Sequence, residues 1–177
     1  LTVNRADGSE GRPVVYASFD GALNWTMIST IMHERPEMMV ICPAPLMLPS
    51  GKIITAFRCQ TSTTSAWTEV YESDDGGLTW RFLSRVNDLG SPCHLDQLDD
   101  GRIVAVYGYR IPPFGVRAKM SEDNGVTWGP ELILRDDGGS WDLGYPRVAA
   151  LKGNRVLTVY YFNEHEPHAN GQSIRHI

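Results

Sequence analysis

A short polar motif recurs along this chain, and its spacing constrains the fold more than any other feature. The motif reads Ser-x-Asp-x-Gly-x-Thr-Trp at 73–80 and again at 121–128, so its period is 121 − 73 = 48 residues. A divergent copy stands at 18–25, where Ala22 replaces the glycine and Asn24 the threonine. A period of this length is typical of folds built from repeated supersecondary units.

A second repeat lies between the copies of the motif. The segments LPSGKIITAF at 48–57, LDDGRIVAVY at 98–107 and LKGNRVLTVY at 151–160 share a leucine, a tight polar turn and a β-branched run. Each segment predicts a β-hairpin. A third strand leads into each motif and a fourth starts at its tryptophan, while helical periodicity is absent. Four antiparallel strands per repeat predict the blades of a β-propeller.

The repeats divide the chain into three to three and a half blades. We expect an incomplete blade at 1–31, full blades at 38–86 and 91–134, and an incomplete last blade at 144–177. A ring of six such blades needs about 300 residues, whereas this chain has 177. Because an open half-ring exposes sheet edges, we expect the missing blades to come from a longer chain or from a homodimer mate.

Charge and composition exclude several classes of function. The net charge of −5 argues against a nucleic-acid partner, which requires a basic face. The most apolar run, at 38–48, is too short to span a membrane and is broken by two prolines. The three cysteines lack the spacing of a metal site, so we predict neither a metal nor another cofactor.

The repeated motif itself predicts a structural role. Its aspartate is suited to accept backbone N–H bonds within a turn, and its tryptophan to pack between strands. The hairpin turns and the motifs fall on one face of a propeller, and the remaining loops on the other. Functional residues gather on long loops, so we expect the site on the face opposite the motifs.

The motifs resemble the Asp-boxes, or bacterial neuraminidase repeats, of the sialidase superfamily. The resemblance implies a six-bladed propeller of which this chain is the C-terminal half. It also implies an exo-glycoside hydrolase that acts on an acidic sugar or glycoconjugate such as a terminal sialic acid, with a tyrosine as nucleophile. A secreted or periplasmic location is typical of this family.

The family pattern assigns roles to residues on the loop face. Arg58, seven residues after Gly51, matches an arginine that clamps the substrate carboxylate. Pro113 stands at the position of the next such arginine, and we assign that role to Arg110, three residues earlier in the same loop. Tyr145, at the start of the last blade, matches the nucleophile. A neutral tyrosine suits this substrate because a carboxylate nucleophile would be repelled by the sugar acid.

One position departs from the family pattern. Cys42 stands where the family has the glutamate that activates the tyrosine. Asp142 and Glu164, on neighbouring loops, are therefore our candidates for the missing base.

Two further residues and one alternative function remain open. Arg147 and His94, at corresponding positions of adjacent blades, are candidates for either substrate contacts or a structural role. A non-catalytic Asp-box propeller that binds carbohydrate or protein is the alternative to an enzyme. Cys42 favours that alternative, whereas Arg58 and Tyr145 in register favour the enzyme.

Overall fold

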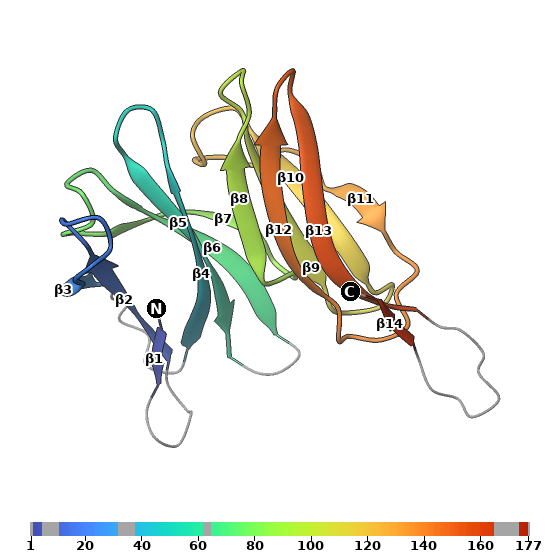
Figure 1. Ribbon diagram of the computed structural model, residues 1–177. Helices are drawn as coiled ribbons and strands as arrows, with labels where there is room; N and C mark the ends of the chain where they lie inside the picture. Colours follow the sequence, from blue (N-terminus) through green and yellow to red (C-terminus); the bar gives the residue numbers. More distant parts are fainter. Residues whose placement is uncertain (1, 5–10, 32–37, 62–64, 165–173, 177) are drawn as a thin grey trace.

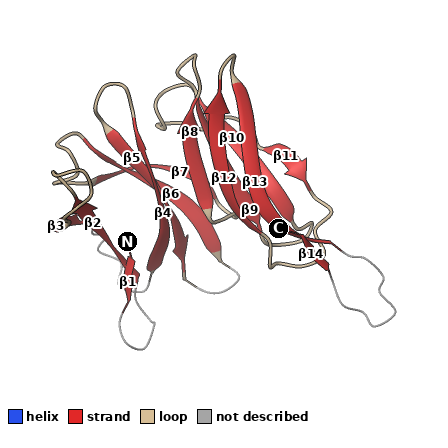
Figure 2. Ribbon diagram, viewed as in Figure 1, coloured by secondary structure: helices blue, strands red, loops and turns tan. Residues whose placement is uncertain are grey.

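The computed structural model describes residues 2–4, 11–31, 38–61, 65–164 and 174–176. All regular structure in this part of the chain is β-strand, arranged in four antiparallel sheets that stand side by side like an open fan (Figures 1 and 2). Among the described residues, no helix has the length and apolar character needed to cross a membrane. The predicted all-β class is confirmed.

Each sheet is a meander in which consecutive strands are neighbours. The two central sheets have four strands and the outer two have three. In chain order the strands are β1 (Thr2–Asn4), β2 (Gly11–Ala17) and β3 (Thr26–Thr30); β4 (Met39–Met47), β5 (Ile53–Gln60), β6 (Ala66–Ser73) and β7 (Arg81–Asn87); β8 (Cys93–Gln97), β9 (Ile103–Tyr109), β10 (Gly115–Ser121) and β11 (Leu132–Arg135); and β12 (Gly144–Leu151), β13 (Arg155–Glu164) and β14 (Ile174–His176).

Three tight hairpins set the direction of the strands. The β4–β5 and β8–β9 turns use the same hydrogen bonds, and each has a glycine in the left-handed region, Gly51 (φ 86°) and Gly101 (φ 89°). The β12–β13 turn places Gly153 and Asn154 there instead. All three turns lie at one end of the molecule (Figure 1). The starts of β4, β8 and β12 therefore lie together at the opposite end.

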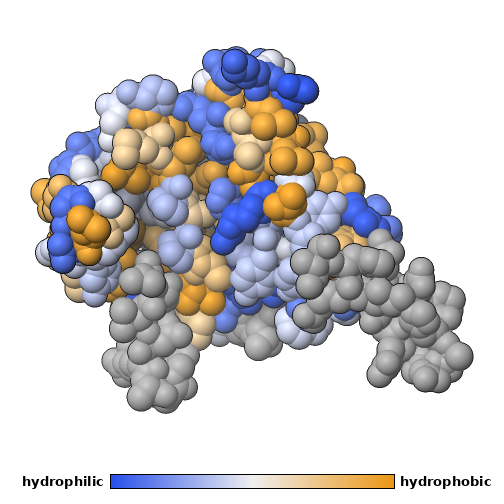
Figure 3. Space-filling view, viewed as in Figure 1, coloured by the Kyte–Doolittle hydropathy of each residue, from blue (hydrophilic) through white to orange (hydrophobic). Residues whose placement is uncertain are grey.

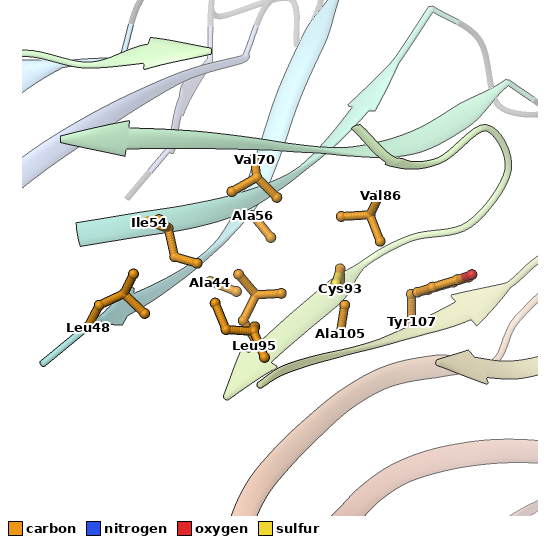
Figure 4. Close-up of a cluster of buried hydrophobic side chains, with 11 residues drawn as sticks. Ala44, Leu48, Ile54, Ala56, Val70, Val86, Cys93, Leu95, Ala105 and Tyr107 are labelled. Atoms are coloured by element: carbon orange, nitrogen blue, oxygen red, sulfur yellow. The ribbon is translucent and has the colours of Figure 1, made fainter. Parts of the chain in front are cut away.

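The core lies between adjacent sheets. Ile54, Ala56 and Val70 of the second sheet pack against Leu95 and Ala105 of the third, and all five are buried (Figure 4). Along β5 the side chains that face this core are two residues apart, as the pleat of a strand requires. The apolar alternation of the sequence therefore holds neighbouring sheets face to face.

In the second and third sheets, the repeated motif forms a link to the preceding sheet. Within the 121–128 copy, Ser121 Oγ and the amide of Thr127 both donate to Asp123 Oδ1, each at 2.8 Å. Trp128 Nε1 donates to Ser84 Oγ of β7 at 3.0 Å, and that hydroxyl donates to the carbonyl of Gly125. The 73–80 copy bonds to Ser29 of β3 in the same way. The motif is thus a structural fastener between sheets.

Candidate functional site

Two corresponding strands, β4 and β12, break register near their starts. The shift lies between Ile41 and Ala44 in β4 and between Gly144 and Arg147 in β12. At each break a non-glycine residue has a left-handed backbone and precedes a proline: Cys42 with φ 57° and Tyr145 with φ 48°. Such bulges re-aim side chains, and backbone strain of this kind gathers at functional sites. Here the two bulges place Cys42 near enough to Tyr145 for the tyrosine to influence the pKa of the thiol.

Two arginines reach the same place from the ends of β5 and β9. Arg58 pairs with Ile41 across the β4–β5 ladder, so it lies beside the Cys42 bulge. Arg110 follows the last residue of β9. Within the described part of the chain, neither guanidinium belongs to an ion pair, and the Nε atom of each is buried without a hydrogen-bond partner. Unpaired buried donors of this kind suit an anionic ligand.

A close approach between the third and fourth sheets brings Arg110 and Tyr145 together. Gly144 has φ 101°, and a Cβ atom there would stand 2.9 Å from the Cα of Gly108. Only glycine combines this backbone with this contact. The end of β9 and the start of β12 are therefore as near as two backbones can pack.

Arg110 is held in place by hydrogen bonds and aromatic rings. Its Nη2 donates to the carbonyl of Leu143 at 2.9 Å and to the hydroxyl of Tyr161 at 3.4 Å. Its guanidinium carbon lies 5.1 Å from the centroid of the Tyr145 ring and 5.8 Å from that of Trp141. These distances are within the range of cation–π attraction. The charged group is thus oriented before any ligand arrives.

An open pocket of about 720 Å³ faces these groups. Its size is that of sites that hold drug-sized ligands. Its lining combines two cations with aromatic and aliphatic side chains: Arg58, Arg110, Ile111, Pro112, Phe114, Trp141 and Tyr145.

The electrostatics of the pocket follow from its burial and its arginines. Burial raises the pKa of the Cys42 thiol, although Arg58, Arg110 and Arg147 partly oppose that shift. The thiol is therefore neutral at pH 7. Burial and the charge of Arg110 lower the pKa of Arg58, while Tyr145 acts in the opposite direction. Two cations this close repel each other, and an anion between them relieves the repulsion.

The candidate base Asp142 contacts a different tyrosine. The hydroxyl of Tyr161 donates to Asp142 Oδ1 at 2.6 Å, and the Tyr161 ring stacks on that of Tyr145, with centroids 5.9 Å apart. Burial, together with the bond to Asp142, raises the pKa of Tyr161 to about 12. The other candidate, Glu164, ends β13 opposite Ile174, and its side chain lies outside the described residues.

His94 and Arg147 lie at the edge of this arrangement. His94 Nδ1 accepts the amide of Val148 at 3.3 Å, and Asp96 accepts the amide of Ala150 at 2.7 Å, so side chains of β8 bond to the backbone of β12. Burial and the charge of Arg147 lower the pKa of His94. Arg147 itself is exposed and donates to the carbonyl of Pro146 at 3.1 Å. Neither residue lines the pocket.

Sequence reasoning missed three aromatic residues of the site, namely Phe114, Trp141 and Tyr161. Trp141 and Tyr145 stand four residues apart in a loop predicted to lie on the functional face, and this placement was the available signal. Tyr161 lies in the run VYYFN, whose continuous aromatic character hides which side chain faces the core.

Comparison with solved structures identifies the fold. The chain superposes with a TM-score of 0.73 on a protein of unknown function from Dyadobacter fermentans DSM 18053, at 27% identity over 98% of this chain and 50% of that one. For the α-L-arabinofuranosidase Arb93A from Fusarium graminearum, the TM-score is 0.70, at 19% identity over 98% and 59%. For the Trypanosoma rangeli sialidase it is 0.50, at 15% identity over 92% and 28%. The fold is a partial β-propeller, and the chain spans between half and three fifths of the first two relatives.

The sequence comparisons give the family. No curated protein matches the chain. The family described as BNR repeat-like domain matches residues 5–157, which is most of the chain and includes all three copies of the motif. The chain therefore belongs to the BNR repeat-like domain family.

Proposed function

We propose that this chain supplies about half of a carbohydrate-binding active site, and that the complete propeller hydrolyses the bond to a terminal acidic sugar such as sialic acid. The observation that carries the proposal is the convergence of Arg58 and Arg110, without ion-pair partners in the described residues, on the pocket lined by Tyr145 and Trp141. Arginine pairs bind carboxylates bidentately, and aromatic rings pack against sugar rings. The α-L-arabinofuranosidase among the structural relatives supports a carbohydrate ligand.

In the catalytic form of the proposal, Tyr145 is the nucleophile. Its oxygen bonds to the anomeric carbon as the glycosidic C–O bond breaks, and its proton passes to a base. The leaving oxygen takes a proton from an acid in the blades that complete the ring, and water later releases the sugar. Asp142 is the base that we assign, because it accepts a hydrogen bond from Tyr161, whose ring stacks on that of Tyr145.

A second candidate function is favoured by one observation. Cys42 stands in the position of the base, but burial raises the pKa of its thiol and keeps it neutral at pH 7, so it cannot take the proton as a carboxylate would. On this alternative the propeller binds an acidic sugar or a glycoprotein without cleaving it. Both functions use Arg58 and Arg110 in the same way.

Turnover and binding assays separate these functions. The longest natural form of the protein is tested for hydrolysis of a fluorogenic sialoside and, by calorimetry, for binding of free sialic acid. The enzyme proposal expects turnover that falls at least 100-fold in Tyr145→Phe, while binding persists. Binding without turnover supports the non-catalytic alternative. Absence of both from a folded protein contradicts the function proposed for this pocket.

A further inference from the structure

A row of hydrogen bonds from backbone to side chain joins β8, the first strand of the third sheet, to β12, the first strand of the last sheet. The two strands stand side by side (Figure 1). The amides of Val148, Ala150 and Gly153 donate at 3.3, 2.7 and 2.8 Å to His94, Asp96 and Asp99, respectively. Each bond joins residues 54 positions apart, so the row keeps one register along the whole boundary.

This row satisfies the backbone of an edge strand. Because β12 is the edge of its sheet in the described part of the chain, its amides on the side away from β13 have no strand to pair with. Buried amides need an acceptor, and the side chains of β8 supply it. The preceding boundary differs, because β4 has Ala44 and Leu46 at the positions of His94 and Asp96 (101 − 51 = 50 residues earlier). Neither of those side chains can accept a hydrogen bond.

His94 bonds to β12 directly after the bulge that carries Tyr145. The register of β12 breaks between Gly144 and Arg147, and Val148 is the next residue. Within the break, the left-handed backbone of Tyr145 (φ 48°) is strained and persists only where the surrounding structure fixes it. From Arg147 onward, β13 fixes one side of the strand. On the other side, His94 is the member of the row that lies nearest to the bulge in sequence.

The bond at His94 depends on pH, unlike those of the two aspartates. A neutral imidazole accepts at Nδ1, whereas an imidazolium carries a proton on both nitrogens and can only donate. Protonation therefore leaves the Val148 amide without its acceptor. Burial, and then the charge of Arg147, lower the pKa of His94 below 6.5, while Asp96 acts in the opposite direction. β4, β5 and β9 also pack against β8, but none of their described residues adds a charge that shifts this pKa.

We propose that His94 is a positioning residue for Tyr145: its neutral imidazole holds β12 beside the Tyr145 bulge, and its protonation in mildly acidic solution releases this segment. Because folding lowers the pKa of His94, its stabilising contribution is complete above the unfolded value of 6.5 and is lost as pH falls through the lower folded value. The inference rests on the proposed function where Tyr145 meets the ligand, but release of the strand is measurable without a ligand.

The test measures hydrogen exchange of the backbone amides at 144–151 by mass spectrometry, at pH 5 and pH 7.5, on the longest natural form of the protein. After correction for the intrinsic effect of pH, we expect exchange in the wild-type segment to be about tenfold faster at pH 5, while β9 stays unchanged. His94→Asn keeps an acceptor that does not titrate and should exchange slowly at both pH values, whereas His94→Ala should exchange fast at both. His176→Asn, in β14, is the matched control and should behave like the wild type.

The affinity for sialic acid connects the strand to the site. A sugar carboxylate stays ionised between pH 5 and pH 7.5, so we expect wild-type affinity to fall about fivefold at pH 5 and that of His94→Asn less than twofold. Exchange that ignores pH, or that responds equally in His94→Asn, contradicts the proposal. Release of the strand with unchanged affinity also overturns the role in positioning Tyr145. A folded protein that binds no sialic acid at either pH contradicts the proposed function, and the exchange result then decides alone whether His94 holds β12.

Discussion

At the scale of single residues, the structure allows two roles for Asp142: the base of the reaction, or only the hydrogen-bond partner of Tyr161. Its carboxylate accepts from Tyr161, whose hydroxyl in turn accepts from Arg110. If Asp142 is the base, Asp142→Asn abolishes turnover at all pH values while the affinity for the acidic sugar is kept or slightly raised, because a negative charge near Arg110 is removed. Sialoside hydrolysis and calorimetry on the same preparation measure both effects. Unchanged turnover would contradict the role of base.

Tyr161 gives a second prediction at this scale. Tyr161→Phe deletes the hydroxyl between Arg110 and Asp142 but keeps the ring that stacks on Tyr145. The guanidinium of Arg110 loses one anchor and becomes free to turn toward the carboxylate of Asp142, away from the ligand. We expect the affinity for sialic acid to fall about fivefold while the melting temperature changes little. Tyr160→Phe, on the adjacent position of β13, is the matched control. Equal affinities in both variants would show that the hydroxyl does not position Arg110.

A third prediction concerns the charge of Asp75, the aspartate of the motif at 73–80. Four hydrogen bonds, two from Thr79 and one each from Ser73 and Leu78, lower the pKa of Asp75 from 3.8 to about 2. A carboxyl whose pKa is lowered on folding stabilises the protein above pH 4, and the effect disappears as pH falls toward 2. Asp75→Asn should therefore lower the melting temperature at pH 7, with a difference that shrinks between pH 4 and pH 2. A difference that is constant with pH would exclude the charge as its cause.

At the scale of elements, Ser84 of β7 tests whether the motif holds the sheets together. Its buried hydroxyl donates to Gly125 and accepts from Trp128, both in the following sheet. Ser84→Ala leaves these two groups without a partner, which should lower the free energy of unfolding by about 1–3 kcal/mol. Urea denaturation measures the change. Glu122→Ala, an exposed substitution in the same motif, should stay within about 0.5 kcal/mol. A cost no larger than that of the control would argue against the fastener role.

The element scale also shows what the sequence reveals and what it hides. The 48-residue period and the hairpin pattern predict the strands because both depend on local turn chemistry and alternation. The bulges in β4 and β12 do not follow from the sequence pattern. Cys42 and Tyr145 each precede a proline, nine residues before Gly51 and Asn154 respectively. Only the backbone angles of the structure show that both residues are left-handed. The Tyr161–Asp142 bond joins residues 19 apart through a folded loop, and no periodicity predicts such a contact.

At the scale of the whole molecule, the last sheet has an apolar face that is exposed in the described part of the chain. The β12–β13 register places Ala149 opposite Leu157 and Arg147 opposite Val159, and these side chains are exposed. Apolar residues cover much of the surface above β12 and β13 in Figure 3. A second apolar region, a groove of about 370 Å³, lies between the first two sheets and is bordered by β2 and β5. In a closed propeller the exposed face of the last sheet packs on another blade.

This face predicts how the chain behaves on its own. Apolar patches and open sheet edges drive association, so we expect the 177-residue chain to form dimers or larger species whose mass rises with concentration. Sedimentation at several concentrations measures this mass. Val159→Lys places a charge in the centre of the exposed face and should weaken association at least tenfold, whereas Lys152→Ala, in the β12–β13 turn, should not. A discrete dimer would support closure of one ring by two copies. A chain that stays monomeric at about 100 μM would contradict the idea that this face requires a partner.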